Sequence, residues 1–149
     1  MAEMSAAMRE FAAHAREGRF ELQRCAECGE VSWPPRDVCG ACWSDRLEWT
    51  PVSRSGVVLA ATALHAPLEE FFRARTPWRV GAVQLEAGPV AYAHLHAAAA
   101  EGGAVRIEAR IDHRGRGVLI ALPRTGARLE DDRNLLELTS GKGGLDERS

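Results

Sequence analysis

The sequence predicts a mainly β protein with a short N-terminal helix, a metal-binding segment and a β-rich body that closes into a small barrel or sandwich. Three observations support this prediction. The cysteines fall into two C-x-x-C pairs, residues 47–124 form apolar runs separated by turn residues, and this body contains no long helical pattern. A chain of 149 residues is expected to bury one compact core with a small appendage.

The N-terminal segment, residues 1–18, has the pattern of an amphipathic helix. Apolar side chains recur at helical spacing, with charged residues between them, at Met4, Ala7, Met8, Phe11 and Ala15. Gly18 follows where the end of a helix favours a residue with positive φ. Apolar and polar residues then alternate up to Cys25, which predicts a strand that leads into the cysteine segment.

The segment from 19 to 46 contains every cysteine of the chain, at Cys25, Cys28, Cys39 and Cys42. Two facing C-x-x-C turns form the tetrahedral sulfur cage that Zn²⁺ accepts, and four thiolates leave no open position for a substrate, so we expect a structural zinc. Iron is a chemically allowed alternative. Disulfides are another, but they need an oxidising compartment, and a redox C-x-x-C normally occurs as a single pair.

Six apolar runs predict five or six strands in the body, at residues 47–53, 57–65, 80–86, 90–96, 105–112 and 118–122. Turn sequences such as Gly88-Pro89 and Arg114-Gly115-Arg116-Gly117 separate the runs. This spacing favours a barrel or sandwich over alternating strand–helix units. Residues 125–149 are polar and offer few apolar side chains for burial, so we expect a partly mobile tail.

Charge and motif content restrict the classes of function. The net charge is −2, whereas a protein that binds nucleic-acid phosphates usually carries an excess of basic residues. The body does contain more arginines than acidic residues, which keeps a barrel that binds single-stranded nucleic acid as the alternative. No apolar run is long enough to cross a bilayer and no signal peptide is recognisable, so we expect a cytoplasmic protein. No histidine, serine or carboxylate stands in a catalytic frame, so we expect no catalytic residues in this chain.

The order of the motifs resembles a known family. The chain reads Gly-Arg-Phe-Glu-Leu-Gln-Arg into Cys25-x-x-Cys28-Gly29, then Pro34-Pro35-Arg36, Cys39-x-x-Cys42, Leu47-Glu48-Trp49, Ser55-Gly56-x-Val58, Thr62-x-x-His65 and Glu86-x-Gly88-Pro89. Over about residues 8–123 this pattern resembles the proteins once catalogued as the domain of unknown function DUF35. The resemblance implies a rubredoxin-like zinc ribbon at 19–46 and an OB-type barrel at 47–124.

Members of that family are accessory subunits of thiolase-superfamily enzymes. The resemblance therefore implies a subunit that binds a thiolase-fold partner, either a thiolase, a thiolase-like aldolase or a synthase. It also implies that the subunit helps to form the partner's acyl-CoA site, with a coenzyme A thioester as the ligand of the complex. The partner would carry the catalytic groups, in a heterotetramer built on the thiolase dimer.

The connection from 66 to 78 is the expected contact region. It is predicted to form a helical turn or two over the barrel mouth, and it carries an apolar stripe beside arginines: Leu68, Phe71, Phe72, Arg73, Arg75 and, just beyond it, Arg79. Exposed apolar surface beside positive charge suits docking on a partner near the phosphates of coenzyme A. In the alternative interpretation, Leu68 and Phe72 only plug the end of the barrel.

Overall fold

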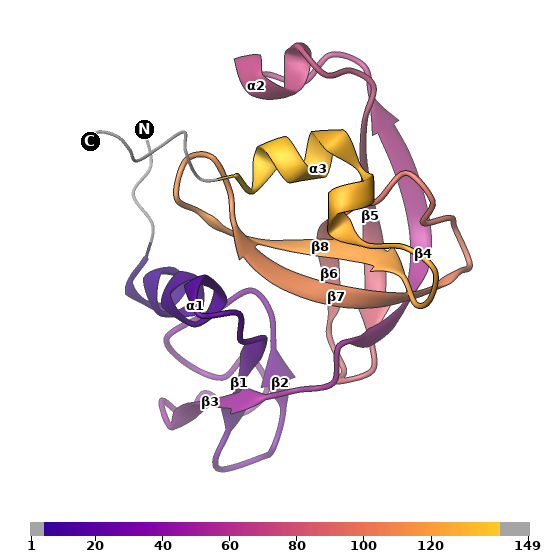
Figure 1. Ribbon diagram of the computed structural model, residues 1–149. Coiled ribbons are helices and arrows are strands. Elements are labelled where there is room, and N and C mark those ends of the chain that lie inside the picture. The colour runs from indigo at the N-terminus through magenta and orange to yellow at the C-terminus, as the bar shows by residue number, and fades with distance from the viewer. Residues whose placement is uncertain (1–4, 141–149) are drawn as a thin grey trace.

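The computed structural model describes residues 5–140, which form a small three-stranded sheet with an adjoining helix and a five-stranded closed barrel (Figure 1). The predicted helix residue Met4 and the tail residues 141–149 lie outside this described part. No helix within residues 5–140 is long and apolar enough to span a bilayer. The mainly β prediction is confirmed.

Helix α1 (Ala6–Arg16) is the predicted amphipathic helix. The Ser5 hydroxyl caps it by accepting a hydrogen bond from the Met8 N–H at 3.1 Å. Phe11 is fully buried at 0 % exposure and meets the ring of Trp33 edge to face, with the centroids 4.8 Å apart. A Cβ at Gly117 would lie 2.6 Å from the Phe11 ring, so the absence of a side chain there lets α1 approach the barrel closely.

The cysteine segment folds as an antiparallel sheet of β1 (Glu21–Cys25), β2 (Val31–Ser32) and β3 (Leu47–Pro51), in the order β2-β1-β3. The apolar pattern of residues 47–53 predicts a strand of the barrel body, and here the structure differs. β3 pairs with β1 from Glu21↔Pro51 to Cys25↔Leu47. Its place follows from the second cysteine pair, because the chain leaves Cys42 beside the end of β1 and runs back along that strand.

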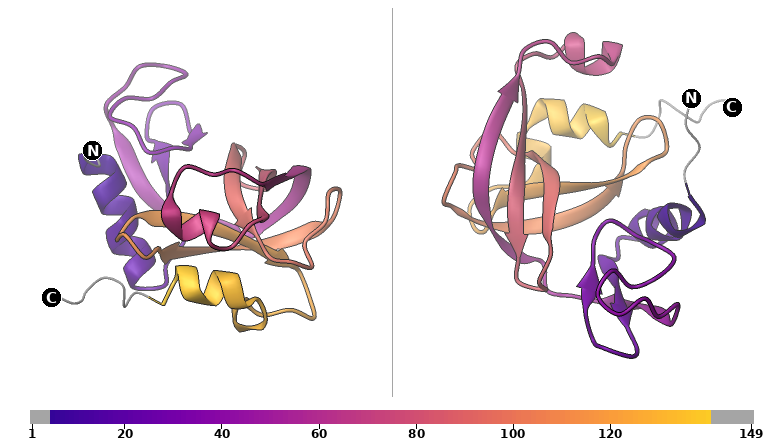
Figure 2. Two further views of the ribbon diagram at one scale, coloured as in Figure 1. Left: turned by 90° about the horizontal axis from the view of Figure 1, so that it is seen from above. Right: turned by 180° about the vertical axis from the view of Figure 1, so that it is seen from behind.

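The barrel consists of β4 (Ser55–Leu64), β5 (Trp78–Leu85), β6 (Val90–Leu95), β7 (Ala104–Ile111) and β8 (Gly117–Pro123). The strands follow the order β4-β5-β6-β8-β7, and the contact between β6 and β8 is parallel. Inward side chains of the barrel share one core with α1 and the cysteine segment, including Phe11, Leu22, Val58, Val83, Ile107 and Leu119. Figure 2 shows α1 and the small sheet as a lobe beside the barrel.

The tail prediction needs correction within residues 125–140. A short 3₁₀ helix, η1 (Leu129–Asp131), and helix α3 (Arg133–Leu138) pack on the outer face of the barrel. Leu129, Leu135 and Leu138 are at most 3 % exposed, and they join a second core cluster. The Asp132 side chain accepts hydrogen bonds from the N–H groups of Leu135, at 3.2 Å, and Ala97, at 2.8 Å. A helix of six residues has too few turns for its pattern to stand out in a polar sequence.

Candidate functional site

The four cysteines form the first candidate site. The Sγ atoms of Cys25 and Cys42 lie 3.5 Å apart, those of Cys28 and Cys39 lie 3.6 Å apart, and all four lie within 4.8 Å of one another. A disulfide requires about 2.05 Å, whereas four sulfurs at about 2.3 Å from one zinc ion are separated by roughly 3.8 Å. The geometry therefore fits a single tetrahedral ion and excludes two disulfides, and the sulfur set fits zinc or iron.

Backbone N–H groups favour the thiolate form at the two buried cysteines. The Cys28 N–H points at Cys25 Sγ at 3.5 Å and lowers the pKa of the Cys25 thiol to about 6. The N–H groups of Cys42 and Ala41 lower the pKa of the Cys39 thiol. Donors directed at sulfur spread the negative charge of a thiolate cage. The segment is therefore arranged to hold a cation, while the closed sulfur shell leaves no position for substrate.

The second candidate region is the outer face of β5 and β6, where OB-type barrels bind ligands together with the loops after their first and fourth strands. In this chain those loops span 65–77 and 112–116. Glu69 of the first loop accepts two hydrogen bonds from the Arg116 guanidinium of the second, at 2.9 and 3.1 Å. Arg116 also donates to the buried Asp112 at 2.8 Å. The hydrogen bond from Arg116 lowers the pKa of Glu69, and the network ties the two loops together.

The part of this face around Trp78 is covered by the chain's own segments. Trp78 of β5 is 3 % exposed, beneath α3 and helix α2 (Glu70–Arg73). Its ring meets those of Phe71 and Phe72 edge to face, at 5.9 and 4.7 Å. Single-strand-binding barrels present aromatic rings on which bases stack. Trp78 is buried under α2 and α3 and does not offer such a surface, whereas Tyr92 of β6 is 80 % exposed on the same face.

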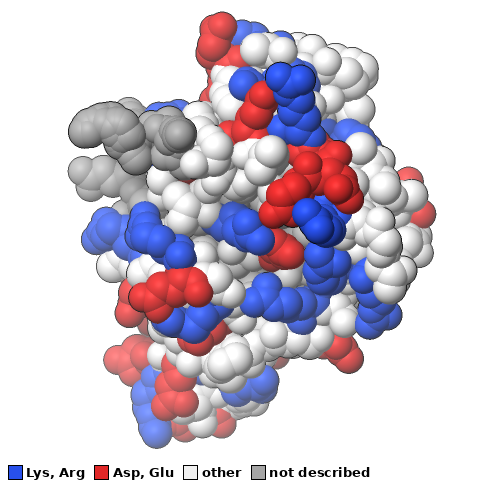
Figure 3. Space-filling view, in the orientation of Figure 1, with Lys and Arg blue, Asp and Glu red and all other residues white. Residues whose placement is uncertain are grey.

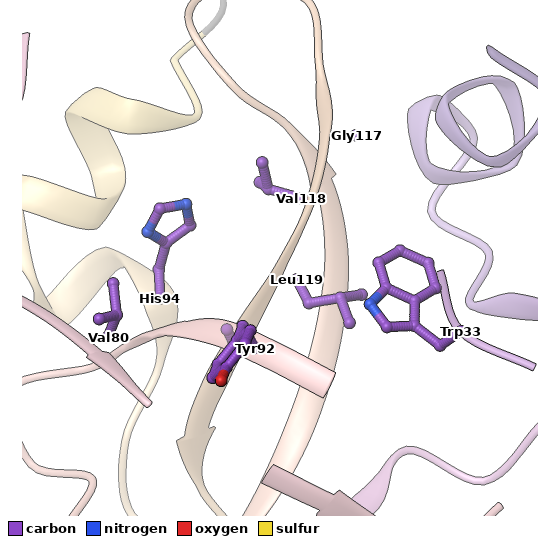
Figure 4. A pocket seen from close by; sticks show the side chains of 8 residues that line it. Trp33, Val80, Tyr92, His94, Gly117, Val118 and Leu119 are labelled. Carbon is purple, nitrogen blue, oxygen red and sulfur yellow. The ribbon is translucent and has the colours of Figure 1, made fainter. Parts of the chain in front are cut away.

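A groove of about 210 Å³ adjoins this cluster, where β6 and β8 diverge. Figure 4 shows His94, Tyr92 and Val118 around it, with Trp33 at its far end. The Trp78 Nε1–H donates to His94 Nδ1 at 2.9 Å, so Nε2 carries the proton of the neutral ring. Burial lowers the pKa of His94 to about 4. His94 therefore offers an uncharged hydrogen-bond donor beside an apolar surface.

The predicted contact residues separate into two groups. Leu68 is 91 % exposed, whereas Phe71 and Phe72 are partly buried against Trp78. The expected apolar stripe is therefore divided, with Leu68 exposed and the two phenylalanines packed on the outer face of the barrel. Neither residue plugs the end of the barrel: Phe72 packs on the outer face against Trp78, and Leu68 is exposed.

The three arginines of this region have partners within the chain. Arg73 donates to the Leu68 carbonyl and to Glu70, and its side chain is half exposed. Arg75 donates to Glu137 at 2.7 Å and lies over the Phe71 ring at 3.8 Å from its centroid. Arg79 donates to the carbonyl of His96 at 2.8 Å. Arg75 therefore links α2 to α3. Of the two arginines on this loop, Arg73 has the more exposed side chain.

The sequence pattern did not pair Glu69 with Arg116, and it did not predict that His94 is buried and neutral. Glu69 and Arg116 are 47 positions apart, and only the fold brings them together. On the face drawn in Figure 3, acidic and basic side chains are interleaved rather than gathered into one basic stripe. Arg106 and Arg110, which both pair with Glu108 on β7, illustrate this mixture.

Comparison with known proteins agrees with both halves of the structure. Residues 12–48 match the family model described as "ChsH2, rubredoxin-like zinc ribbon domain", and residues 49–116 match "ChsH2, C-terminal OB-fold domain". A solved structure described as "Ltp2-ChsH2(DUF35) aldolase" is similar with a TM-score of 0.70 and 21 % sequence identity, over 84 % of this chain and 100 % of that chain. The resemblance to DUF35 proteins is thereby confirmed: the chain belongs to the ChsH2 family, in which a rubredoxin-like zinc ribbon precedes an OB-fold domain.

Proposed function

We propose that this protein is a non-catalytic accessory subunit that binds a thiolase-fold partner and helps to form the partner's acyl-CoA site. The observation that carries the proposal is the exposed Leu68 on the loop that covers the Trp78 end of the ligand face. α2 and α3 bury Trp78, while the loop that holds α2 leaves Leu68 91 % exposed. A large apolar side chain presented on an ordered loop suits contact with another protein. The similar solved structure is an "Ltp2-ChsH2(DUF35) aldolase", which supports a thiolase-like aldolase as the partner.

The metal proposed for Cys25, Cys28, Cys39 and Cys42 is a structural zinc. The family description supports zinc over iron, while the sulfur geometry fits either ion. Its contribution is to folding, because the loops between the cysteines contain little apolar surface and the ion joins them to the sheet. This places no chemistry at the metal and leaves the reaction to the partner.

The proposed contact surface consists of Leu68 with Arg73 beside it. Phe71, Phe72 and the Arg75–Glu137 ion pair lie beneath and hold the loop in place. A half-exposed arginine can pair with a phosphate of coenzyme A or with a carboxylate of the partner. We assign Leu68 to affinity for the partner and Arg73 to affinity for the acyl-CoA.

The test is reconstitution with a thiolase-superfamily aldolase subunit. Light scattering would measure the complex, and cleavage of an acyl-CoA substrate would measure activity. We expect Leu68→Asp to weaken complex formation at least tenfold, about 1.4 kcal/mol, with an unchanged melting temperature. Tyr92→Asp is the matched control, because Tyr92 is 80 % exposed and lies on β6 rather than on this loop.

We expect Arg73→Ala to raise the KM for acyl-CoA severalfold while the complex still forms. Equal partner binding by the wild-type chain and the Leu68 variant would contradict the proposed surface. Turnover of an acyl-CoA by the isolated chain would contradict the non-catalytic role.

A further inference from the structure

Strand β4 extends past the closed part of the barrel. Its first residues, 55–57, pair with β7, and Val58 exchanges backbone hydrogen bonds with Gly102 and Gly103. From Ala60 to Leu64 the strand pairs with β5. No strand of the described residues 5–140 pairs with the opposite side of this stretch. Figure 1 shows β4 rising beyond the barrel toward α2.

The register identifies the backbone groups on this open edge. The Glu86 N–H donates to the Ser55 carbonyl, so Ser55 directs its backbone groups toward β5. Along an antiparallel strand, every second residue then bonds to β5 and the residues between them face the other side. One extra residue between Val58 and Ala60 shifts the alternation by one position on β4. Ala60, Thr62 and Leu64 therefore bond to β5. Ala61 and Ala63 direct their N–H and C=O groups away from it, toward the open edge.

The open edge after the bulge carries no charged residue or proline that would block pairing with another strand. Proteins commonly block such edges with lysine, proline or an inward charge. Residues 59–64 read Leu-Ala-Ala-Thr-Ala-Leu, without charge or proline. Leu59 is 49 % exposed and Leu64 is 37 % exposed. The side chains are uncharged, so a second strand can approach without burying a charge.

We propose that a second copy of this chain pairs antiparallel along β4, about a two-fold axis that passes beside Thr62. In this register, Ala61 of each copy lies opposite Ala63 of the other copy, so the two-fold axis generates two such pairs. All four open N–H and C=O groups of each copy are then paired. Thr62 lies opposite Thr62 and Leu64 lies opposite Ala60, on the outer face of the joined sheet. The proposal does not rest on the function proposed above.

The symmetry of the segment favours a second copy over an unrelated strand. The two residues that direct backbone groups outward are both alanine, one on each side of Thr62. The pairing joins the β4-β5-β6 halves of two barrels into one continuous sheet. The contact is short compared with a standard interface of about 1,600 Å², so we expect a weak dimer.

The first test measures the mass of the isolated metal-loaded chain by analytical ultracentrifugation over a range of concentrations. We expect a dimer at about 100 µM that dissociates on dilution toward 1 µM. Ala63→Pro removes an edge N–H without touching the ladder with β5, so it should raise the dissociation constant at least tenfold. Ala63→Val is the control, because it keeps the N–H and should keep the dimer. A monomeric wild-type chain at 100 µM, or an Ala63→Pro variant that dimerises as well as Ala63→Val, would overturn the proposal.

The second test maps the contact even if the proline variant fails to fold. Thr62 lies at a pair without hydrogen bonds between the copies, where Cα atoms are about 4.5 Å apart, within the range of a disulfide. Thr62→Cys in metal-loaded protein should therefore form a disulfide-linked dimer on mild oxidation. Tyr92→Cys, at an exposed position of β6, and the wild-type chain are the controls and should stay unlinked. Linking at Tyr92→Cys equal to that at Thr62→Cys would show a different or non-specific contact.

Discussion

Lowering the pH from 8 to 5.5 tests the hydrogen bond that joins Trp78 to His94. The Trp78 Nε1–H donates to His94 Nδ1 at 2.9 Å, which requires a neutral imidazole with an unprotonated Nδ1. Phe72 stacks on the His94 ring with the centroids 5.8 Å apart and helps to remove it from water. This burial lowers the pKa of His94 from its ordinary 6.5 to about 4.

The direction in which folding stability changes with pH follows from proton uptake by His94 in the unfolded and the folded state. Below pH 6.5 the unfolded chain binds a proton at this histidine, whereas the folded protein stays neutral there until the pH approaches 4. The contribution of the neutral histidine to folding stability is therefore complete above pH 6.5 and is lost as the pH falls from 6.5 to about 4. At pH 5.5, about one unit below the pKa of the unfolded state, the loss is about 1.4 kcal/mol.

Urea unfolding of metal-loaded protein at the two pH values measures this loss. His94→Gln is the reference variant, because its amide oxygen accepts a hydrogen bond but does not titrate. Groups that titrate elsewhere, such as Glu69 and Glu137, change equally in both chains. We expect the wild-type free energy of unfolding to fall by about 1.4 kcal/mol more than that of the variant. Equal losses in the two proteins would refute the assignment of a buried neutral His94.

Three further predictions address the packing, the metal and the rival function. Leu138→Ala changes a side chain with 0 % exposure and should lower the free energy of unfolding by about 2–4 kcal/mol. Leu136→Ala, at a side chain with 42 % exposure, is the control and should change the free energy of unfolding little. Equal melting temperatures of the two variants would show that α3 does not support the barrel. Cys39→Ser should abolish stoichiometric zinc in elemental analysis and unfold the small sheet, whereas Trp43→Ala, at an 82 % exposed neighbour of the site, should retain the metal. Single-stranded DNA should not bind with micromolar affinity at about 150 mM salt, and tight binding with a steep salt dependence would restore the nucleic-acid alternative.

The sequence determined the features that depend on local pattern or spacing. The two C-x-x-C pairs predicted the sulfur cage, because a ligand set of this kind is defined by residue type and short separations along the chain. The helical spacing of Ala7, Met8, Phe11 and Ala15 predicted α1. Alternating apolar runs predicted the five strands of the barrel, since one face of each strand must be buried.

Only the tertiary structure decided how distant segments meet. β3 has the pattern of a barrel strand but pairs with β1, because strand pattern specifies a buried face and not a partner. The three buried leucines of η1 and α3 were too few to predict a helix, and they are buried because the outer face around Trp78 offers apolar surface. The Glu69–Arg116 pair and the neutral His94 depend on loops that the closed barrel brings together. Charge pairing and burial are properties of neighbours in space, and residues many positions apart become neighbours only when the chain folds.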